Sequence, residues 1–155
     1  MTQLKRKEAR ELLFGLLFEK EFKADETVDG IYEISTEARE IPEDLYIKNG
    51  FYGISEKSEL LDTVISKYAK GWKADRLSRV SRSVIRLAVY EMLFCKDIPA
   101  NVSISEAVEL VKKYGEDKAR AFVNGVLSGI NKDITEQGVE AFLAAATENT
   151  EETEA

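Results

Sequence analysis

Apolar residues recur every three or four positions through most of the chain, which is the spacing of the buried face of an α-helix. The clearest such face has four members: Ala107, Val108, Val111 and Tyr114. Ser103 and Glu106 form an S-x-x-E capping box in front of this face, and Gly115 offers a left-handed residue that can end the helix. The pattern therefore predicts a helix from about Ile104 to Tyr114.

A second helix is predicted directly after it, with Asp117 as the N-terminal cap. Its apolar side chains again fall on one side: Ala119, Phe122, Val123, Val126 and Ile130. Asn124-Gly125 is typical of a hairpin turn, but the flanking apolar runs are short and their period is helical. We therefore expect an unbroken helix, in which Gly125 lets a neighbouring helix approach closely.

The first seventy residues predict three helices. The first has an apolar face of Ala9, Leu12, Leu13, Leu16 and Leu17. Beside this face lies an aromatic stripe of Phe14, Phe18 and Phe22. An arc this broad indicates contact with two neighbouring helices, although Phe18 could instead lie on a partner surface. The second helix is expected at about residues 25–39. The third is expected within residues 43–70, where Pro42 could begin it and glycines at 50–53 could kink it.

A fourth helix in chain order is expected over about residues 76–96, capped by Asp75. Three arginines recur on it at helical spacing and form a cationic ridge: Arg79, Arg82 and Arg86. A solvated face with salt bridges is the simpler interpretation of this ridge, and RNA contact is the alternative. Arg86 lies within an apolar stretch, so we expect it to form a structural ion pair with Glu91 or Glu106.

These elements predict an all-α fold of about six or seven helices that form two small packed bundles. The expected bundles are residues 1–71 and 75–132, which together make one binding domain of residues 1–132. Residues 133–155 are expected to add a short helix and a disordered acidic tail, because the final segment TENTEETEA is too polar to fold alone.

Composition excludes several classes of function. The chain has 155 residues, of which 44% are hydrophobic and 33% charged, as in a globular domain with a buried core. With no histidine and one cysteine, Cys95, it lacks Ser-His-Asp, Cys-His and zinc-binding motifs, and no phosphate-binding glycine loop occurs. We therefore expect no enzyme activity, metal or cofactor. The single cysteine, the missing signal peptide and the lack of a long apolar run predict a cytoplasmic protein without a membrane span.

The net charge of −7 is unevenly distributed. Residues 133–155 hold seven acidic residues and no Lys or Arg, so the other 132 residues carry 22 charges of each sign. Four cations stand together at the start of the chain: Lys5, Arg6, Lys7 and Arg10. Cations in this arrangement can neutralise phosphates, although basic N-termini are common and the signal is weak by itself.

Five short sequence segments, taken in chain order, form a recognisable pattern. They are EARELLFGLLFE (8–19), IRLAVYEM (85–92), DIP (97–99), SISEAVELVKKYG (103–115) and FVNGVL (122–127). Together they resemble the NusB family of bacterial transcription antitermination factors, over about residues 4–132, and they are far more specific than one short motif. The family usually has Gln at the position of Gly15 and Asn at that of Ser105, and residues 25–60 match only loosely.

The resemblance implies a helical adaptor that binds single-stranded boxA-type RNA together with NusE, a small-subunit ribosomal protein. The pair would help the elongating RNA polymerase complex to resist termination on ribosomal RNA operons. RNA contacts are expected from Lys5, Arg6, Lys7, Arg10, Arg120 and Phe122. Partner contacts are expected from Phe18, Arg79, Arg82 and Lys118. Phe122 would stack on a base, but a place in the core is an equally good interpretation, whereas the core is favoured for Val123, Val126 and Leu127.

Two other classes of function remain open. The RNA-binding domain at the front of certain ribosomal RNA cytosine methyltransferases looks similar, but no catalytic domain follows it here. The other is a protein-only helical module, such as a homodimer that hides its RNA face, which the acidic total favours and the basic first turn opposes. The acidic tail is interpreted as solubilising, and the sharper alternative is an RNA mimic that competes for the basic first helix.

Overall fold

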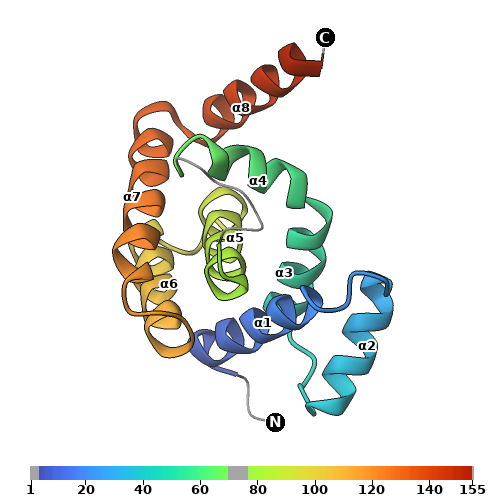
Figure 1. Cartoon of the computed structure of the whole chain (residues 1–155). Coiled ribbons are helices and arrows are strands. Elements are labelled where there is room, and N and C mark those ends of the chain that lie inside the picture. Colours follow the sequence, from blue (N-terminus) through green and yellow to red (C-terminus); the bar gives the residue numbers. More distant parts are fainter. Residues whose placement is uncertain (1–3, 70–76, 155) are drawn as a thin grey trace. The chain divides into compact units, whose positions relative to one another are not determined.

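The computed structural model describes residues 4–69 and 77–154, and these ranges contain eight α-helices and no strand. The all-α class is confirmed, but the predicted number of six or seven helices is too low. The helices belong to two compact units, residues 1–56 and 57–155 (Figure 1). The junction expected at residues 71–75 and the cap expected from Asp75 lie outside the described residues.

The first unit contains α1 (Arg6–Lys20), α2 (Val28–Ala38) and α3 (Leu45–Glu56). All three helices contribute to its core, through Leu13, Leu16, Ile31, Ile47, Phe51 and Ile54. α1 packs against both α2 and α3, as its broad apolar arc predicted. The approach of α1 to α3 is close, because a Cβ atom on Gly50 would lie 2.5 Å from Leu13 Cδ2. Gly50 is therefore a packing contact within α3, which continues through the glycines at 50 and 53.

Side-chain caps set the starts of α2 and α3. Thr27 Oγ1 accepts a hydrogen bond of 3.0 Å from the Gly30 amide, and Asp44 Oδ1 accepts one of 3.0 Å from the Ile47 amide. α3 therefore begins at Leu45. Pro42, which was expected to begin this helix, lies in the connection before it.

The segment 43–70 was expected to form a single helix, but it forms two. α3 ends at Glu56, and α4 (Ser58–Ser66) begins after Lys57, whose φ of −98° and ψ of 16° interrupt the helix. The interruption assigns α4 to the second unit, where it packs against α5 and α8.

The end of α2 holds a residue in a costly backbone conformation. Glu40 has a φ of 55°, which lies in the left-handed region that disfavours a side chain. The Glu40 amide donates to the Glu37 carbonyl at 3.1 Å, and the Ile41 amide donates to the Thr36 carbonyl at 2.9 Å. These two bonds form a Schellman motif, in which glycine is the usual left-handed residue.

The variant Glu40→Gly is therefore expected to raise the free energy of unfolding by about 0.5 kcal/mol, because relief of the left-handed strain exceeds the entropy that glycine adds to the unfolded chain. Urea denaturation followed by circular dichroism measures this difference. Glu37→Gly is the matched control, since Glu37 lies within the helix and the same change there should lower the free energy of unfolding. Equal losses in both variants would contradict the strain at Glu40.

The second unit contains α4, α5 (Arg79–Phe94), α6 (Ala100–Tyr114), α7 (Ala119–Gln137) and α8 (Val139–Glu154). α5 is its central helix, because it packs against α4, α6 and α7 (Figure 1). This position explains why so many of its residues are buried, among them Val84, Ile85, Leu87, Ala88, Val89 and Leu93. The Ser78 hydroxyl caps α5 by accepting a hydrogen bond of 3.0 Å from the Ser81 amide.

Arg86 forms the structural ion pair that its apolar surroundings predicted, but with a different partner. Its Nε and Nη2 atoms each donate a hydrogen bond of 2.8 Å to the carboxylate of Asp62 on α4. The pair ties α5 to α4 in a bidentate geometry, with Asp62 as a partner that the sequence did not suggest.

Ser103 does not cap α6. This helix begins at Ala100, after Pro99, four residues before the expected start. Ser103 is only 1% exposed, and its hydroxyl donates a hydrogen bond of 2.7 Å to Glu91 Oε1 on α5. The apparent capping box is thus a buried polar contact between α5 and α6.

α6 ends at Tyr114 as predicted, but for another reason. Gly115 has a φ of −110°, so it is not in the left-handed region. A Cβ atom on Gly115 would lie 3.1 Å from the Val111 carbonyl oxygen and 3.2 Å from Val80 Cγ1. The absence of a side chain at Gly115 therefore allows close packing.

α7 continues through Asn124-Gly125, so the rejection of a hairpin is confirmed. Of the face predicted to be buried, Val123, Val126 and Ile130 are buried together with Leu127, whereas Ala119 is half-buried and Phe122 is 36% exposed. The close approach expected at Gly125 is wrong, because no described atom lies within 4 Å of a Cβ atom built there. Gly129 has this role instead, since its Cβ atom would lie 3.2 Å from Tyr68 Cδ1. Asp117 does not cap α7, which has no side-chain cap.

α8 extends further than the sequence predicted. Gly138, with a φ of 88° that favours glycine, separates it from α7. α8 packs against α4 and α7 and buries Phe142 and Ala146. In place of a short helix with a disordered tail, the helix continues to Glu154, because no glycine or proline follows Gly138 and the segment is rich in the helix formers Ala and Glu. None of the described helices is long and apolar enough to cross a membrane.

Candidate nucleic-acid interface

The first turn of α1 presents cations to solvent. Lys5, Arg6 and Lys7 are all exposed, and the Arg6 guanidinium carbon lies 4.4 Å from the centroid of the Tyr46 ring. Tyr46 on α3, which the sequence did not single out, thus holds Arg6 by a cation–π contact. The start of a helix also favours anions through its unsatisfied amides. This turn of α1 is therefore suited to a phosphate backbone.

Arg10 differs from the other three predicted cations. It is only 3% exposed, and its guanidinium carbon lies 5.9 Å from the centroid of the same Tyr46 ring. A guanidinium this deeply buried supports the packing of α1 and α3. The sequence could not separate Arg10 from Lys5, Arg6 and Lys7, because all four have the same charge.

A row of aromatic rings follows α1. The ring centroids of Phe14 and Phe18 are 6.0 Å apart, and those of Phe18 and Phe22 are 5.2 Å apart. Phe18, the predicted partner contact, is half-buried, whereas Phe22 is 59% exposed. The exposed end of the row is therefore Phe22, which the sequence assigned only to the aromatic stripe.

Arg39 lies across α1 next to this row. Its Nη1 atom would be 2.7 Å from a Cβ atom on Gly15, and its Nη2 atom is 3.5 Å from Glu19 Oε1. Gly15 thus leaves room for the Arg39 guanidinium. A larger residue at position 15 would displace Arg39 from α1.

In the second unit, the other predicted RNA contacts stand at the start of α7. Phe122 is 36% exposed, so its ring reaches the surface while the residues that follow it turn into the core. Arg120 Nη2 lies 3.3 Å from Asp117 Oδ1, and Lys118 Nζ lies 3.6 Å from Glu116 Oε2. Exposed ion pairs of this kind are weak, so a phosphate can replace the carboxylate.

The end of α6 adds cations and an aromatic ring that the sequence pattern did not indicate as a site. Lys112 and Lys113 are exposed, Tyr114 is 45% exposed, and Lys113 Nζ lies 5.3 Å from the centroid of the Tyr114 ring. The signal was present in the sequence as two lysines followed by tyrosine, but the apolar period assigned Tyr114 to the core.

The predicted partner residues Arg79 and Arg82 belong to the first turn of α5. Arg79 is exposed, and Arg82 is half-buried. Arg86, the third member of the ridge, is occupied by Asp62. Arg86 is therefore not grouped with Arg79 and Arg82 as a candidate partner contact.

The model of the NusB family matches residues 7–132. The chain belongs to the NusB family. This match includes every candidate contact named above except Lys5 and Arg6, which lie just before it, and it ends before α8.

Curated relatives agree with this assignment. The chain is 42% identical over 131 residues to the transcription antitermination protein NusB of Bacillus subtilis (strain 168), which covers 84% of this chain and 98% of that protein. It is 37% identical over 134 residues to the protein of the same name from Clostridium perfringens (strain 13 / Type A), with 84% and 99% covered.

Solved structures with the same fold include a structure of T. maritima NusB, with a TM-score of 0.74, 40% identity, and coverage of 84% of this chain and 93% of that chain. Another is a crystal structure of antitermination factors NusB and NusE in complex with dsRNA. It matches with a TM-score of 0.73, 33% identity, and coverage of 83% of this chain and 96% of that chain. The all-helical fold of this NusB family chain is thus shared with both.

Proposed function

We propose that this NusB family chain is a transcription antitermination factor that binds boxA-type RNA together with NusE and supports transcription of ribosomal RNA operons. The observation that carries the proposal is its likeness to a solved complex of NusB, NusE and RNA over most of its length. The chain acts by binding within the elongating RNA polymerase complex, without a catalytic step, metal or cofactor, and it works in the cytoplasm.

The exposed residues support a division of roles. Lys5, Arg6 and Lys7 neutralise RNA phosphates, with Arg120 as a further cation, and Phe122 offers its ring to a base. NusE contacts are assigned to Phe18, Arg79, Arg82 and Lys118. Arg10 keeps the first helix in place.

The proposal is tested by measuring the binding of a labelled boxA-like RNA, with and without NusE, at about 50 mM and about 200 mM salt. We expect tighter RNA binding with NusE. If binding of NusE raises the affinity of the chain for RNA, binding of RNA raises its affinity for NusE by the same factor. We also expect at least about 20-fold weaker binding at the higher salt, because the contacts of Lys5, Arg6 and Lys7 with a single strand alone give a factor of this size.

Absence of RNA binding with and without NusE would overturn the proposal. The alternative is then a protein-only helical module, such as a homodimer that hides its RNA face. Association through apolar helix faces should change little with salt, so light scattering at the same two salt concentrations identifies this alternative.

Replacing Phe122 by Ala is expected to weaken RNA binding about tenfold, because a stacked base contributes about 1–3 kcal/mol. Because Phe122 is only 36% exposed, this change should also lower the unfolding midpoint, so RNA binding is measured well below the midpoint of the variant. Phe122→Tyr keeps the ring and is the matched control, with affinity near that of the unmodified chain. Unchanged RNA affinity together with a lower unfolding midpoint would place Phe122 in the core instead.

A further inference from the structure

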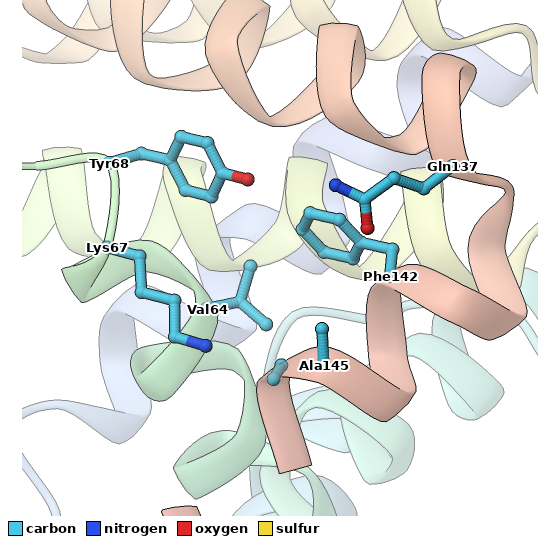
Figure 2. A pocket seen from close by; sticks show the side chains of 7 residues that line it. Val64, Lys67, Tyr68, Gln137, Phe142 and Ala145 are labelled. Atoms are coloured by element: carbon cyan, nitrogen blue, oxygen red, sulfur yellow. The ribbon is translucent and has the colours of Figure 1, made fainter. Parts of the chain in front are cut away.

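A cavity of about 130 Å³ opens between α4, α7 and α8 of the second unit (Figure 2). Its inner wall is apolar and includes Val64, Phe142 and Ala146, all of them buried. The rings of Tyr68 and Phe142 stand 6.3 Å apart between centroids with an interplanar angle of 26°. The volume is close to that of an engineered cavity of about 150 Å³ that binds benzene. It is therefore large enough for one aromatic ring.

The wall formed by Tyr68 is held in place from two sides. Its hydroxyl donates a hydrogen bond of 2.6 Å to Asp133 Oδ2 on α7, and its ring lies against Gly129, where a Cβ atom would be 3.2 Å away. Burial and the bond to Asp133 raise the pKa of Tyr68, so the hydroxyl keeps its proton and remains a donor. Tyr68 is therefore not free to rotate into the cavity and fill it.

The polar groups at the opening of the cavity carry a net positive charge. Lys67 and Gln137 border the cavity, and Figure 2 shows the Lys67 side chain extending from the end of α4 towards α8. Among the described residues that line the cavity, Lys67 is the charged one, and none of them carries a carboxylate. An ammonium group and an amide beside two aromatic rings are complementary to a flat apolar molecule that carries a negative group.

We propose that this cavity binds a small single-ring aromatic carboxylate. The ring contacts Val64, Tyr68 and Phe142, and the carboxylate faces Lys67 and Gln137. The proposal is independent of RNA binding. Phe142, Ala145 and Ala146 belong to α8, which lies beyond the matched residues 7–132, so the site is a property of this chain's own C-terminal helix.

Such a ligand would contact α4 and α8 at once. Because it binds only when α8 lies on α4 and α7, it would stabilise the docked position of α8 by mass action. Binding should therefore be accompanied by slower hydrogen exchange in the first turns of α8.

The test uses the full chain, with benzoate as probe and benzamide as its uncharged counterpart. Methyl signals of Val64, Ala145 and Ala146 are followed by nuclear magnetic resonance during each titration. We expect saturable shifts at these methyl groups with benzoate at millimolar concentration, and about threefold weaker binding of benzamide, which is what one exposed charge pair contributes. Absence of saturable shifts with benzoate would overturn the proposal.

Two pairs of variants locate the ligand. Ala145→Leu fills the mouth of the cavity and should abolish benzoate binding, whereas Ala144→Leu, at the neighbouring exposed position outside the cavity, should leave it unchanged. Lys67→Gln should weaken benzoate about threefold without affecting benzamide, and Lys132→Gln, which removes the same charge elsewhere, should have no effect. Binding that survives Ala145→Leu would show that benzoate sits elsewhere and would overturn the assignment.

Discussion

The triple variant Lys5→Ala, Arg6→Ala, Lys7→Ala is expected to bind boxA-type RNA about 50-fold more weakly at about 0.15 M salt. Each phosphate contact on a single strand contributes a salt slope of about 0.7, so three contacts account for a factor of this size. The slope of affinity against salt should fall by about two at the same time. Fluorescence anisotropy over a salt series measures both quantities.

The matched control removes three exposed lysines elsewhere, through Lys48→Ala, Lys96→Ala and Lys132→Ala. It changes the net charge equally, so an effect of total charge alone would appear in both variants. Helix content should remain unchanged in the triple variant, because its three side chains are exposed. Arg10→Ala, in contrast, should lower the free energy of unfolding, since Arg10 is only 3% exposed. A triple variant that keeps its RNA affinity would move the phosphate contacts away from α1.

Replacing Ser103 by Ala is expected to lower the free energy of unfolding by about 2 kcal/mol. Ser103 and Glu91 are each 1% exposed and are joined by a hydrogen bond of 2.7 Å. Removal of the hydroxyl takes a donor from a carboxylate that water cannot reach, and the loss of a hydrogen bond to such a group costs about 1.5–3 kcal/mol. Urea denaturation measures the change.

Ser105→Ala is the control for this prediction, because Ser105 is an exposed serine on the same helix. The same chemical change there should alter the free energy of unfolding by less than about 0.5 kcal/mol. Both changes place a better helix former in α6, so similar losses in the two variants would show that the loss at Ser103 does not come from its contact with Glu91.

The candidate interface was partly predictable from the sequence. Lys5, Arg6 and Lys7 are exposed in the structure, and Phe122 reaches the surface at the start of its helix. A charge count cannot show which cation is buried, so the different position of Arg10 emerged only when α1 packed against α3. The exposure of Phe22 and Tyr114 was missed for the same reason, because a helical period does not say how far each helix is covered.

Several local motifs changed their role once the helices packed. Ser103 has the spacing of a cap but bonds to a neighbouring helix, and Asp117 pairs with Arg120 where a cap was expected. Gly125 was expected to be a contact point, whereas Gly129 provides it. Each of these residues can either act within its own segment, for example as a helix cap, or contact another group. Which of the two it does depends on the segment that packs against it.

The sequence by itself determined the helical class, the continuity of α7 through Asn124-Gly125, most of the buried positions and the family, because apolar period and ordered sequence words are properties of the chain alone. The tertiary structure decided which partner each polar residue found: Asp62 for Arg86, Glu91 for Ser103 and Asp133 for Tyr68. These partners are 24, 12 and 65 positions away in the chain. Contacts of this kind depend on how helices pack, and helix packing is set by the shapes of whole faces, which no local pattern encodes.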